Sequence, residues 1–479
     1  IRGYLDRAAQ GDYRGSVQII KERNPFPTVI GRICPRPCED QCRRQYVDEP
    51  VAINYCKRFV ADEERRSGER IQPFKAPETG RRMAVVGGGV AGLSTAFFSA
   101  RLGHSPVVYE AGAQLGGLLR RAISRYRLSH DILDWDIEGI LEMGVEARLN
   151  QAMGRDFTIT DLLKEGFESV YLATGGWDSR LARNEAGVVQ SIFPGAYLLI
   201  DLIRFGRQEA PQLTINTHAV IMGGGQLALE AAEICKRQGA ASITVLLRDG
   251  QGHASLESDD REALDKLNAQ VVTNAAIVRL EGEENRLTTV AWVDLQNGET
   301  TEVPAETLIM SAGRFPELIF SPDGSASPSE EGAAASEGPL RWKAVPPYKQ
   351  ADASGQIGLF APGDDLTDYS GAIKAIAAGR RAAASIHQML YGMTPDVPAK
   401  VCNRDTLIQN VDAVEAVAPA HRHIMPVASP RELDREGQLE LGFAPETARA
   451  EAARCLQCGL ICYAHTEKTT AIEDIRQSA

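Results

Sequence analysis

The sequence has no hydrophobic run of the length that membrane proteins need. No apolar stretch approaches the roughly 20 residues that cross a bilayer. The first residues, from Ile1 to Arg7, lack the apolar centre of a secretory signal peptide. They also lack an initiator methionine, which is compatible with a longer native chain upstream. We therefore predict a cytoplasmic protein without membrane insertion.

Positive charge is also in short supply. The chain has 52 Lys and Arg residues against 64 Asp and Glu residues, which gives a net charge of −12 at pH 7. Nucleic acids and anionic membrane surfaces attract basic proteins, so neither is expected as the main partner. The eight histidines show no recurring spacing of the kind that binds metal, and we expect surface or core roles for them.

Cysteine, in contrast, is grouped. Of the nine cysteines, three lie in Cys34-Pro-Arg-Pro-Cys-Glu-Asp-Gln-Cys42 and three in Cys455-Leu-Gln-Cys-Gly-Leu-Ile-Cys462. Such short spacings in a long chain that does not look secreted favour metal binding over disulfides. The length of 479 residues predicts two to four domains.

A glycine-rich turn follows the apolar segment that begins at Met83. In Gly87-Gly-Gly-Val-Ala91-Gly92, Gly87 permits a tight turn, Gly89 lets a pyrophosphate approach the backbone, and Gly92 permits close packing of the next helix. Glu110 ends the following strand, where a carboxylate accepts ribose hydroxyls. Strand, helix and acid together predict a dinucleotide site, against the alternative of a merely structural turn.

The same unit recurs after the strand that begins at Ala219. The motif Gly223-Gly-Gly225-Gln226-Leu-Ala again lies between an expected strand and helix. The next strand ends in Arg248-Asp249, where Asp249 can bind both ribose hydroxyls and would repel a 2′-phosphate, while Arg248 could attract one. NADH is therefore slightly favoured over NADPH, unless the two residues are only a solvated surface pair.

Two such units predict a doubly wound α/β fold, and a flavin with a nicotinamide is the economical pairing of two dinucleotides. Glu110 to Gly117, Tyr171 to Gly175 and Gly358 to Asp364 lie where a split flavin domain would place its remaining contacts. Neither nucleotide unit contains Cys-x-x-Cys, so a dithiol mechanism lacks its chemistry. Cys235, in the helix after the second turn, is expected to be a core residue.

Here the chain resembles a known family, that of the flavin-containing small subunit of glutamate synthase and the large subunit of NADH-dependent ferredoxin:NADP oxidoreductase. Besides the two glycine turns, the matching stretches extend to about residue 395. They include Asn24-Pro-Phe-Pro, Gly31-Arg-Ile-Cys-Pro, Pro50-Val-Ala-Ile, Lys57-Arg-Phe-Val-Ala-Asp, Tyr126-Arg-Leu and Gly363-Asp364.

The resemblance implies two Rossmann-like domains of the disulfide-reductase and adrenodoxin-reductase type, with an α-helical iron–sulfur domain before them and a Cys-containing tail after them. The expected ranges are 1–78 for the iron–sulfur domain, 79–205 and 319–395 for the FAD domain, 206–318 for an inserted NAD(P)H domain, and 396–479 for the tail. FAD is implied at the first turn and NAD(P)H at the second. The implied cofactor contacts are Gly87, Gly89, Ala91, Gly92, Glu110, Gly117, Arg127, Thr174, Gly363, Asp364 and Ile373, with Gly223, Gly225, Gln226, Arg248, Asp249 and Gly313.

The resemblance also implies [4Fe–4S] clusters, for which thiolates are suitable soft ligands. Either the missing ligands of the first group lie upstream of Ile1, or one cluster is completed by Cys34, Cys38, Cys42 and Cys56. For the tail we expect Cys402, Cys455, Cys458 and Cys462. A structural zinc is the alternative at both places, and unligated thiols are a further one in the tail.

These features predict a subunit that transfers electrons between NAD(P)H, FAD and clusters, to or from other redox subunits or ferredoxin. Hydride transfer between stacked rings needs no acid or base, so we name no catalytic side chain. The alternatives are a free-standing NAD(P)H:ferredoxin oxidoreductase and a flavoprotein scaffold that carries no current.

Overall fold

The computed structural model describes residues 1–175, 193, 195–207, 215, 217–223, 226–247, 258–310, 317–323, 338–347, 371–393 and 417–458. Eight of the predicted site residues lie outside this part of the chain. They are Gly225, Arg248, Asp249, Gly313, Gly363, Asp364, Cys402 and Cys462.

The chain begins with a group of short helices. Asp12 starts the second by accepting the N–H of Gly15 at 2.9 Å, and Pro27 starts the third with a backbone angle suited to a first helical turn. The elements are α1 (Arg2–Gln10), α2 (Tyr13–Lys21), α3 (Pro27–Ile33), α4 (Pro37–Asp40), the 3-10 turn η1 (Arg43–Tyr46) and α5 (Ile53–Ser67).

A nine-stranded sheet follows, in the order β11-β10-β9-β14-β13-β4-β1-β2-β3. Its parallel part is β1 (Arg82–Val86), β2 (Ser105–Tyr109), β3 (Glu146–Arg148) and β4 (Ser169–Leu172). The antiparallel extension is β9 (Ala275–Glu283), β10 (Arg286–Asp294), β11 (Thr300–Pro304), β13 (Leu318–Pro322) and β14 (Arg341–Val345).

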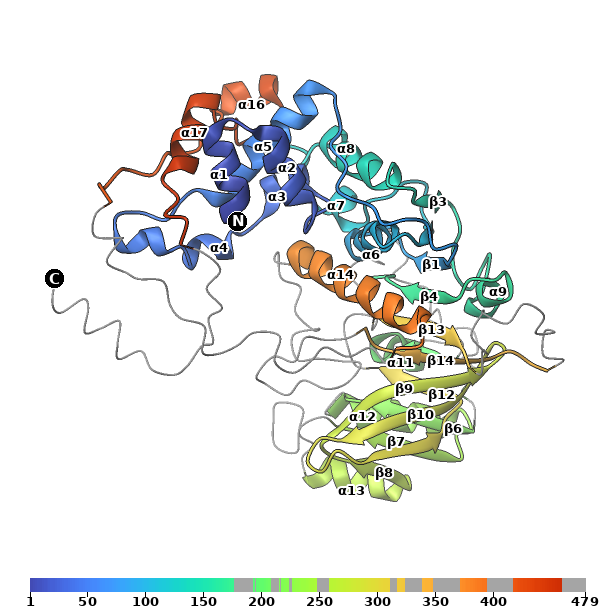
Figure 1. The fold of residues 1–479 in the computed structure, drawn as a ribbon. Helices are drawn as coiled ribbons and strands as arrows, with labels where there is room; N and C mark the ends of the chain where they lie inside the picture. The colour runs from blue at the N-terminus through green and yellow to red at the C-terminus, as the bar shows by residue number, and fades with distance from the viewer. Residues whose placement is uncertain are drawn as a thin grey trace.

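Strand β1 is buried on both faces, as expected of a central parallel strand. Met83 and Val85 face one apolar cluster, and Ala84 and Val86 face the other. The first cluster is covered by α6 (Val90–Arg101), α8 (His130–Leu141) and α14 (Gly371–Leu390), and α14 lies along α6. Figure 1 shows α14 crossing beside this sheet. The short helices α7 (Leu118–Arg121) and α9 (Ile159–Lys164) complete this part.

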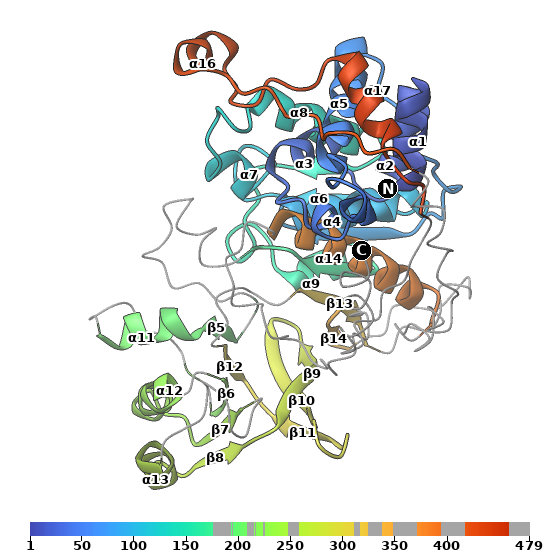
Figure 2. The ribbon, with the colours of Figure 1, turned by 90° about the vertical axis from the view of Figure 1, so that its left-hand side faces the viewer.

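The second sheet is entirely parallel, in the order β5-β12-β6-β7-β8. Its strands are β5 (Ala196–Leu198), β6 (His218–Met222), β7 (Ser242–Leu246), β8 (Ala269–Val272) and β12 (Thr307–Met310). One face carries α11 (Leu199–Arg207), α12 (Gln226–Arg237) and α13 (Ser258–Lys266), and the other faces the β9–β11 meander (Figure 2). The doubly wound α/β fold class predicted from the sequence is confirmed.

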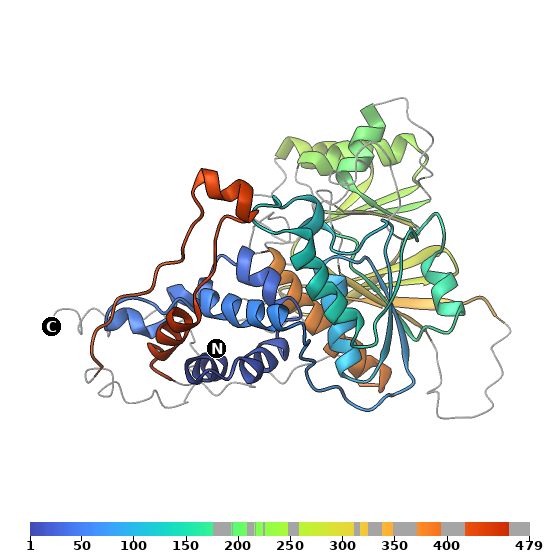
Figure 3. The ribbon, with the colours of Figure 1, turned by 90° about the horizontal axis from the view of Figure 1, so that it is seen from above.

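Two details differ from the expected division of the chain. The β9–β11 meander lies within 206–318, but its hydrogen bonds to β14 join it to the first sheet. The described part of the tail, with α16 (Pro430–Glu436) and α17 (Pro445–Ala453), is not a separate unit, because α17 packs against α1 and α5 (Figures 1 and 3). None of the helices described here has the length and apolar character to cross a bilayer.

Candidate functional site: two glycine turns and a group of thiols

The first glycine turn lies where the strand order of the nine-stranded sheet reverses, between β1 and β4. Gly87 has a φ of 114° and donates its N–H to Tyr109 at 2.8 Å. A side chain at Gly87 would collide with the carbonyl of Ala173, and one at Gly92 would collide with the carbonyl of Gly87. Both glycines are therefore required by close backbone approach, at the sheet position where doubly wound folds bind nucleotides.

Gly89 differs from these two because nothing crowds it. No atom lies within 4 Å of the position that a Cβ would take there. Gly89 is also the N-cap of α6, and no side chain caps the free N–H groups of this helix. Helix α6 has twelve residues, and its open N-terminus suits a pyrophosphate because it offers free N–H groups and the positive end of the helix dipole.

Glu110 holds the turn from the end of β2. Its side chain is buried and accepts the N–H of Gly88 at 2.8 Å and that of Gly112 at 2.7 Å. The segment after it returns to the same turn, since Gly116 donates to the carbonyl of Gly88 at 2.8 Å. Gly117 has a φ of 53°, and a Cβ there would lie 3.0 Å from the Cα of Gly89. Gly117 thus lies against the predicted pyrophosphate site.

The remaining predicted flavin contacts fall around this turn. Thr174 follows β4 and lies beside Gly87, and its buried hydroxyl has no hydrogen-bond partner within the described structure, as expected of a group that awaits a ligand. Ile373 lies in the first turn of α14 and packs on the same apolar cluster as α6. Arg127 instead lines a small cavity with Arg32, Arg58 and the tail residues 438–440. Apart from Arg127, the residues present fit FAD.

The second glycine turn has the same place in its own sheet. Gly223 has a φ of 69° and donates its N–H to Leu246 of β7 at 2.8 Å. Helix α12 follows the turn and begins at Gln226, and Ala228 in its first turn is fully buried. The strand order reverses between β6 and β12, which places a nucleotide site at the end of β6.

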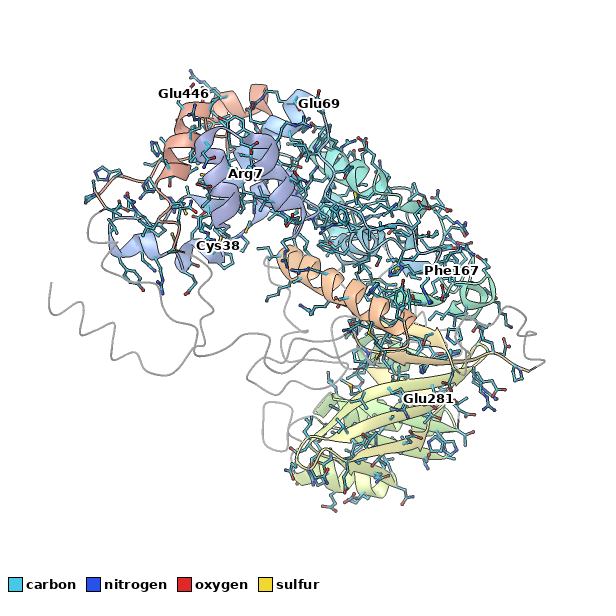
Figure 4. All side chains as sticks on the ribbon, viewed as in Figure 1. Arg7, Cys38, Glu69, Phe167, Glu281 and Glu446 are labelled. Carbon is cyan, nitrogen blue, oxygen red and sulfur yellow. The ribbon has the colours of Figure 1, made fainter. Side chains whose placement is uncertain are left out.

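The thiols come from both ends of the chain. Cys56 is buried in the apolar core of the N-terminal helices, and Cys38, Cys42 and Cys455 pack against this core. Figure 4 places Cys38 on α4 at the edge of this helical domain. Cys34 lies in the neighbouring core, beside the flavin-site elements, and its sulfur accepts the N–H of Arg36 at 3.3 Å.

Burial changes the acidity of these thiols. It raises the pKa of Cys38 to about 11 and raises the pKa of Cys56 well above its ordinary value of 9.0. Iron binds the thiolate, so loading a cluster here must release protons. In the described part of the chain no three Cys, His, Asp or Glu side chains converge on one ion. In a [4Fe–4S] cluster each cysteine binds a different iron, so its ligands do not have to converge on one point as those of a single zinc ion do.

Sequence reasoning missed the polar residues that hold the tail beside these thiols. The buried Glu39, between Cys38 and Cys42, accepts the N–H of Asn54 at 2.9 Å and pairs with Arg422 at 2.5 Å. Its place between two cysteines was the only signal available, and nothing in the sequence tied it to residue 422.

Comparison with known proteins fits this geometry. The family "Pyridine nucleotide-disulphide oxidoreductase" matches residues 81–329, and the family "Dihydropyrimidine dehydrogenase domain II, 4Fe-4S cluster" matches residues 1–69. The beta subunit of NADP(+)-dependent formate dehydrogenase from Moorella thermoacetica is 30% identical, over 96% of this chain and 69% of the relative.

Two Escherichia coli K12 proteins are each 27% identical. They are the NAD-dependent dihydropyrimidine dehydrogenase subunit PreT, over 80% of this chain and 86% of the relative, and the glutamate synthase [NADPH] small chain, over 81% and 86%. The predicted resemblance is therefore confirmed, and so are FAD, NAD(P)H and a 4Fe–4S cluster as the cofactors. The chain belongs to the pyridine nucleotide-disulphide oxidoreductase family, as an FAD-dependent NAD(P)H oxidoreductase with an N-terminal 4Fe–4S domain.

Proposed function

We propose that this chain is the subunit of a larger redox complex that connects NAD(P)H to single-electron carriers. NAD(P)H binds at the second glycine turn, FAD at the first, and the N-terminal cluster exchanges electrons with a partner subunit. The names of the relatives support this proposal, since the Moorella thermoacetica protein and PreT are both named as subunits of dehydrogenases.

The observation that carries the proposal is a shared apolar core between the thiols and the flavin site. Cys34 and Ile30 of the N-terminal domain lie in one buried cluster with Leu115 and Leu119, which flank Gly116 and Gly117 beside the glycine turn. Ile376, in the second turn of α14, belongs to the same cluster. In the described part of the chain, the loop that carries Cys34 and the segment beside the glycine turn share this buried cluster, which favours electron transfer between them.

Polar contacts hold these two domains in one arrangement. The buried carboxyl of Asp136, on α8, accepts the N–H of Val29 in the first turn of α3 at 2.9 Å. At the other edge, Arg101 at the end of α6 donates to the carbonyl of Glu22 at 2.7 Å. A fixed distance between carriers suits a chain whose task is to conduct electrons.

Helix α14 is held in the same way against the flavin turn. A Cβ at Gly379 would lie 2.6 Å from the Cβ of Ser94 and 2.7 Å from the carbonyl oxygen of Ala91, so the two helices touch backbone to backbone. This contact fixes the N-terminus of α14 relative to Gly89, where a positive helix end stabilises a reduced, anionic ring. Bound FAD would supply the step from a two-electron hydride transfer to single-electron transfers.

The nicotinamide preference remains a prediction from Asp249, whose carboxylate would repel a 2′-phosphate. The relatives do not decide it, because one is named NADP(+)-dependent and another NAD-dependent. We expect faster flavin reduction by NADH than by NADPH.

The proposal is tested on anaerobically purified full-length protein whose flavin, iron and zinc are quantified. Stopped-flow mixing with NADH or NADPH should bleach the flavin absorbance, and freeze-quenched samples should then show the paramagnetic signal of a reduced cluster. Flavin reduction without any cluster signal would contradict the proposal and favour a scaffold or a simple diaphorase. Multiple turnovers with ferredoxin by the isolated chain would instead identify a free-standing reductase.

A further inference from the structure

The tail returns to the N-terminal domain and completes its core. Phe443, Ala448 and Ala452 of the tail lie in the same buried cluster as Leu5 and Phe59. Helix α17 packs against α1 and α5 (Figure 3). The chain between residues 79 and 416 thus separates two parts of one folding unit.

A buried carboxylate fixes α17 to α5. The side chain of Glu451 is fully buried and accepts the N–H of Ala52, the N-cap of α5, at 2.7 Å. Arg454 pairs with Glu451 at 2.7 Å, and the ring Nδ1 of His423 lies 2.8 Å from it. Since Cys56 lies one turn into α5, this contact fixes the position of α17 along α5 and so relative to that thiol.

A second set of contacts aligns the tail with the loop that carries Cys42. Asp48 binds Arg44 at 2.6 Å and Arg454 at 2.9 Å, and Arg44 also donates to the carbonyl of Arg454 at 3.1 Å. Arg44 is two residues after Cys42, and Arg454 directly precedes Cys455. Two arginines on one aspartate therefore hold the segments that carry Cys42 and Cys455 side by side.

The backbone around Cys455 repeats the arrangement around Cys34. In both segments the second residue after the cysteine, Arg36 or Gln457, has a left-handed backbone, with φ of 67° and 51°. At Cys34 the N–H of this residue donates to the cysteine sulfur at 3.3 Å. Backbone N–H donors to sulfur are a means by which proteins stabilise cluster thiolates and tune their potential.

We propose that Cys455 is a ligand of the N-terminal [4Fe–4S] cluster, which it binds together with Cys38 and Cys42. The tail then supplies a ligand to the N-terminal cluster domain, and Cys455 does not belong to a separate metal site with Cys402. This inference rests on the 4Fe–4S domain and not on the partner subunit of the proposed function, so either can fail without the other.

The test compares Cys455→Ser with Cys235→Ser, a buried thiol of α12 in the second sheet domain, in full-length protein purified anaerobically. We expect Cys455→Ser to lose up to about four iron atoms per chain or to convert its cluster signal, with flavin content unchanged. Iron content and electron paramagnetic resonance spectra equal to those of Cys235→Ser would overturn the proposal.

A measurement on the unsubstituted protein covers the case in which Cys455→Ser does not fold. Iodoacetamide labelling with mass spectrometry, before and after removal of iron by a chelator, should show Cys455 becoming reactive together with Cys38 and Cys42. Equal labelling of Cys455 in both states would refute its role as a ligand. Iron-dependent protection of Cys458 but not of Cys455 would also overturn the proposal, because Cys458 would then be the ligand from the tail.

Discussion

The two glycine turns follow one sequence pattern, but their last positions have different requirements. At the flavin-side turn a Cβ on Gly92 would meet the carbonyl of Gly87, whereas Ala228 at the matching position of the second turn is accommodated in full burial. The flavin-side helix α6 is also pressed by α14 across Gly379. A glycine at the last position of the motif therefore indicates close packing of the helix onto its turn, and not simply that a nucleotide binds.

The largest effect is expected from placing a methyl group at the tight position. Gly92→Ala should destabilise the flavin domain by about 3 kcal/mol, because the added methyl group would collide with a backbone oxygen, that of Gly87, and not with a flexible side chain. Flavin absorbance per chain and the apparent Tm should both fall. Gly338→Ala, at a glycine with no atom within 4 Å of the added Cβ, is the matched control. Normal flavin content in Gly92→Ala would remove the packing argument.

Gly89→Ala separates binding from folding within the same turn. The added methyl meets no protein atom, so the apparent Tm of the flavin-free protein should stay unchanged. It would, however, stand where the pyrophosphate approaches, and FAD affinity should fall on the order of 10-fold to 100-fold. Titration of flavin-stripped protein with FAD measures this. An unchanged affinity would mean that FAD does not cross this turn.

The flavin domain and the NAD(P)H domain differ again in their contacts. Among the described residues, the flavin domain is the one that is hydrogen-bonded to the iron–sulfur domain, for example through Asp136 and Val29. Burial raises the pKa of Asp136 to about 7, opposed by hydrogen bonds from Val29 and Thr28 and by Lys21, while Glu64 adds to the rise. The folded protein thus holds a proton that the unfolded chain releases near pH 4. The stabilisation from this proton is complete below that pH and is lost as the pH rises to about 7.

Asp136→Asn keeps an oxygen that can accept the N–H of Val29 but cannot ionise. Between pH 4 and 7 the parent should lose stability by up to about 1.4 kcal/mol per pH unit from this group, and the variant should not. Apparent Tm against pH for both proteins measures the difference. Parallel curves would show that Asp136 is ionised throughout.

Local pattern was enough to predict the strand, the turn and the helix of the first glycine motif. The strand, the glycines and Glu110 lie within 28 residues of one another, and the parallel order of β1, β2 and β4 follows from the right-handed connections of such units. The stretch from Gly371 to Leu390 is rich in alanine, which favours a helix, and it forms α14 with these bounds. These are contacts that short-range sequence determines.

The place of the tail could not be predicted in the same way. Glu451 and Ala52 are 399 residues apart, and an isolated glutamate on a nine-residue helix gives no indication of its partner. The pairing of β14 with β9 is a similar case, because an antiparallel strand can extend either sheet by the same hydrogen bonds. Both depend on long-range packing, which the periodicity of one segment does not contain.

The smallest effect is expected at the tolerant position, and it completes the comparison of the two turns. If packing alone selects the last residue, Ala228→Gly should cost only about 1 kcal/mol of stability, from added backbone freedom in α12 and a small loss of buried surface. The rate of flavin reduction by NADH should remain within about twofold of the parent, because a transition-state change of roughly 0.4 kcal/mol or less corresponds to such a factor. Stopped-flow reduction and the apparent Tm measure the two quantities on one preparation. A large loss of rate at unchanged stability would show instead that the methyl group of Ala228 positions the nicotinamide nucleotide, and the two turns would then differ in recognition as well as in packing.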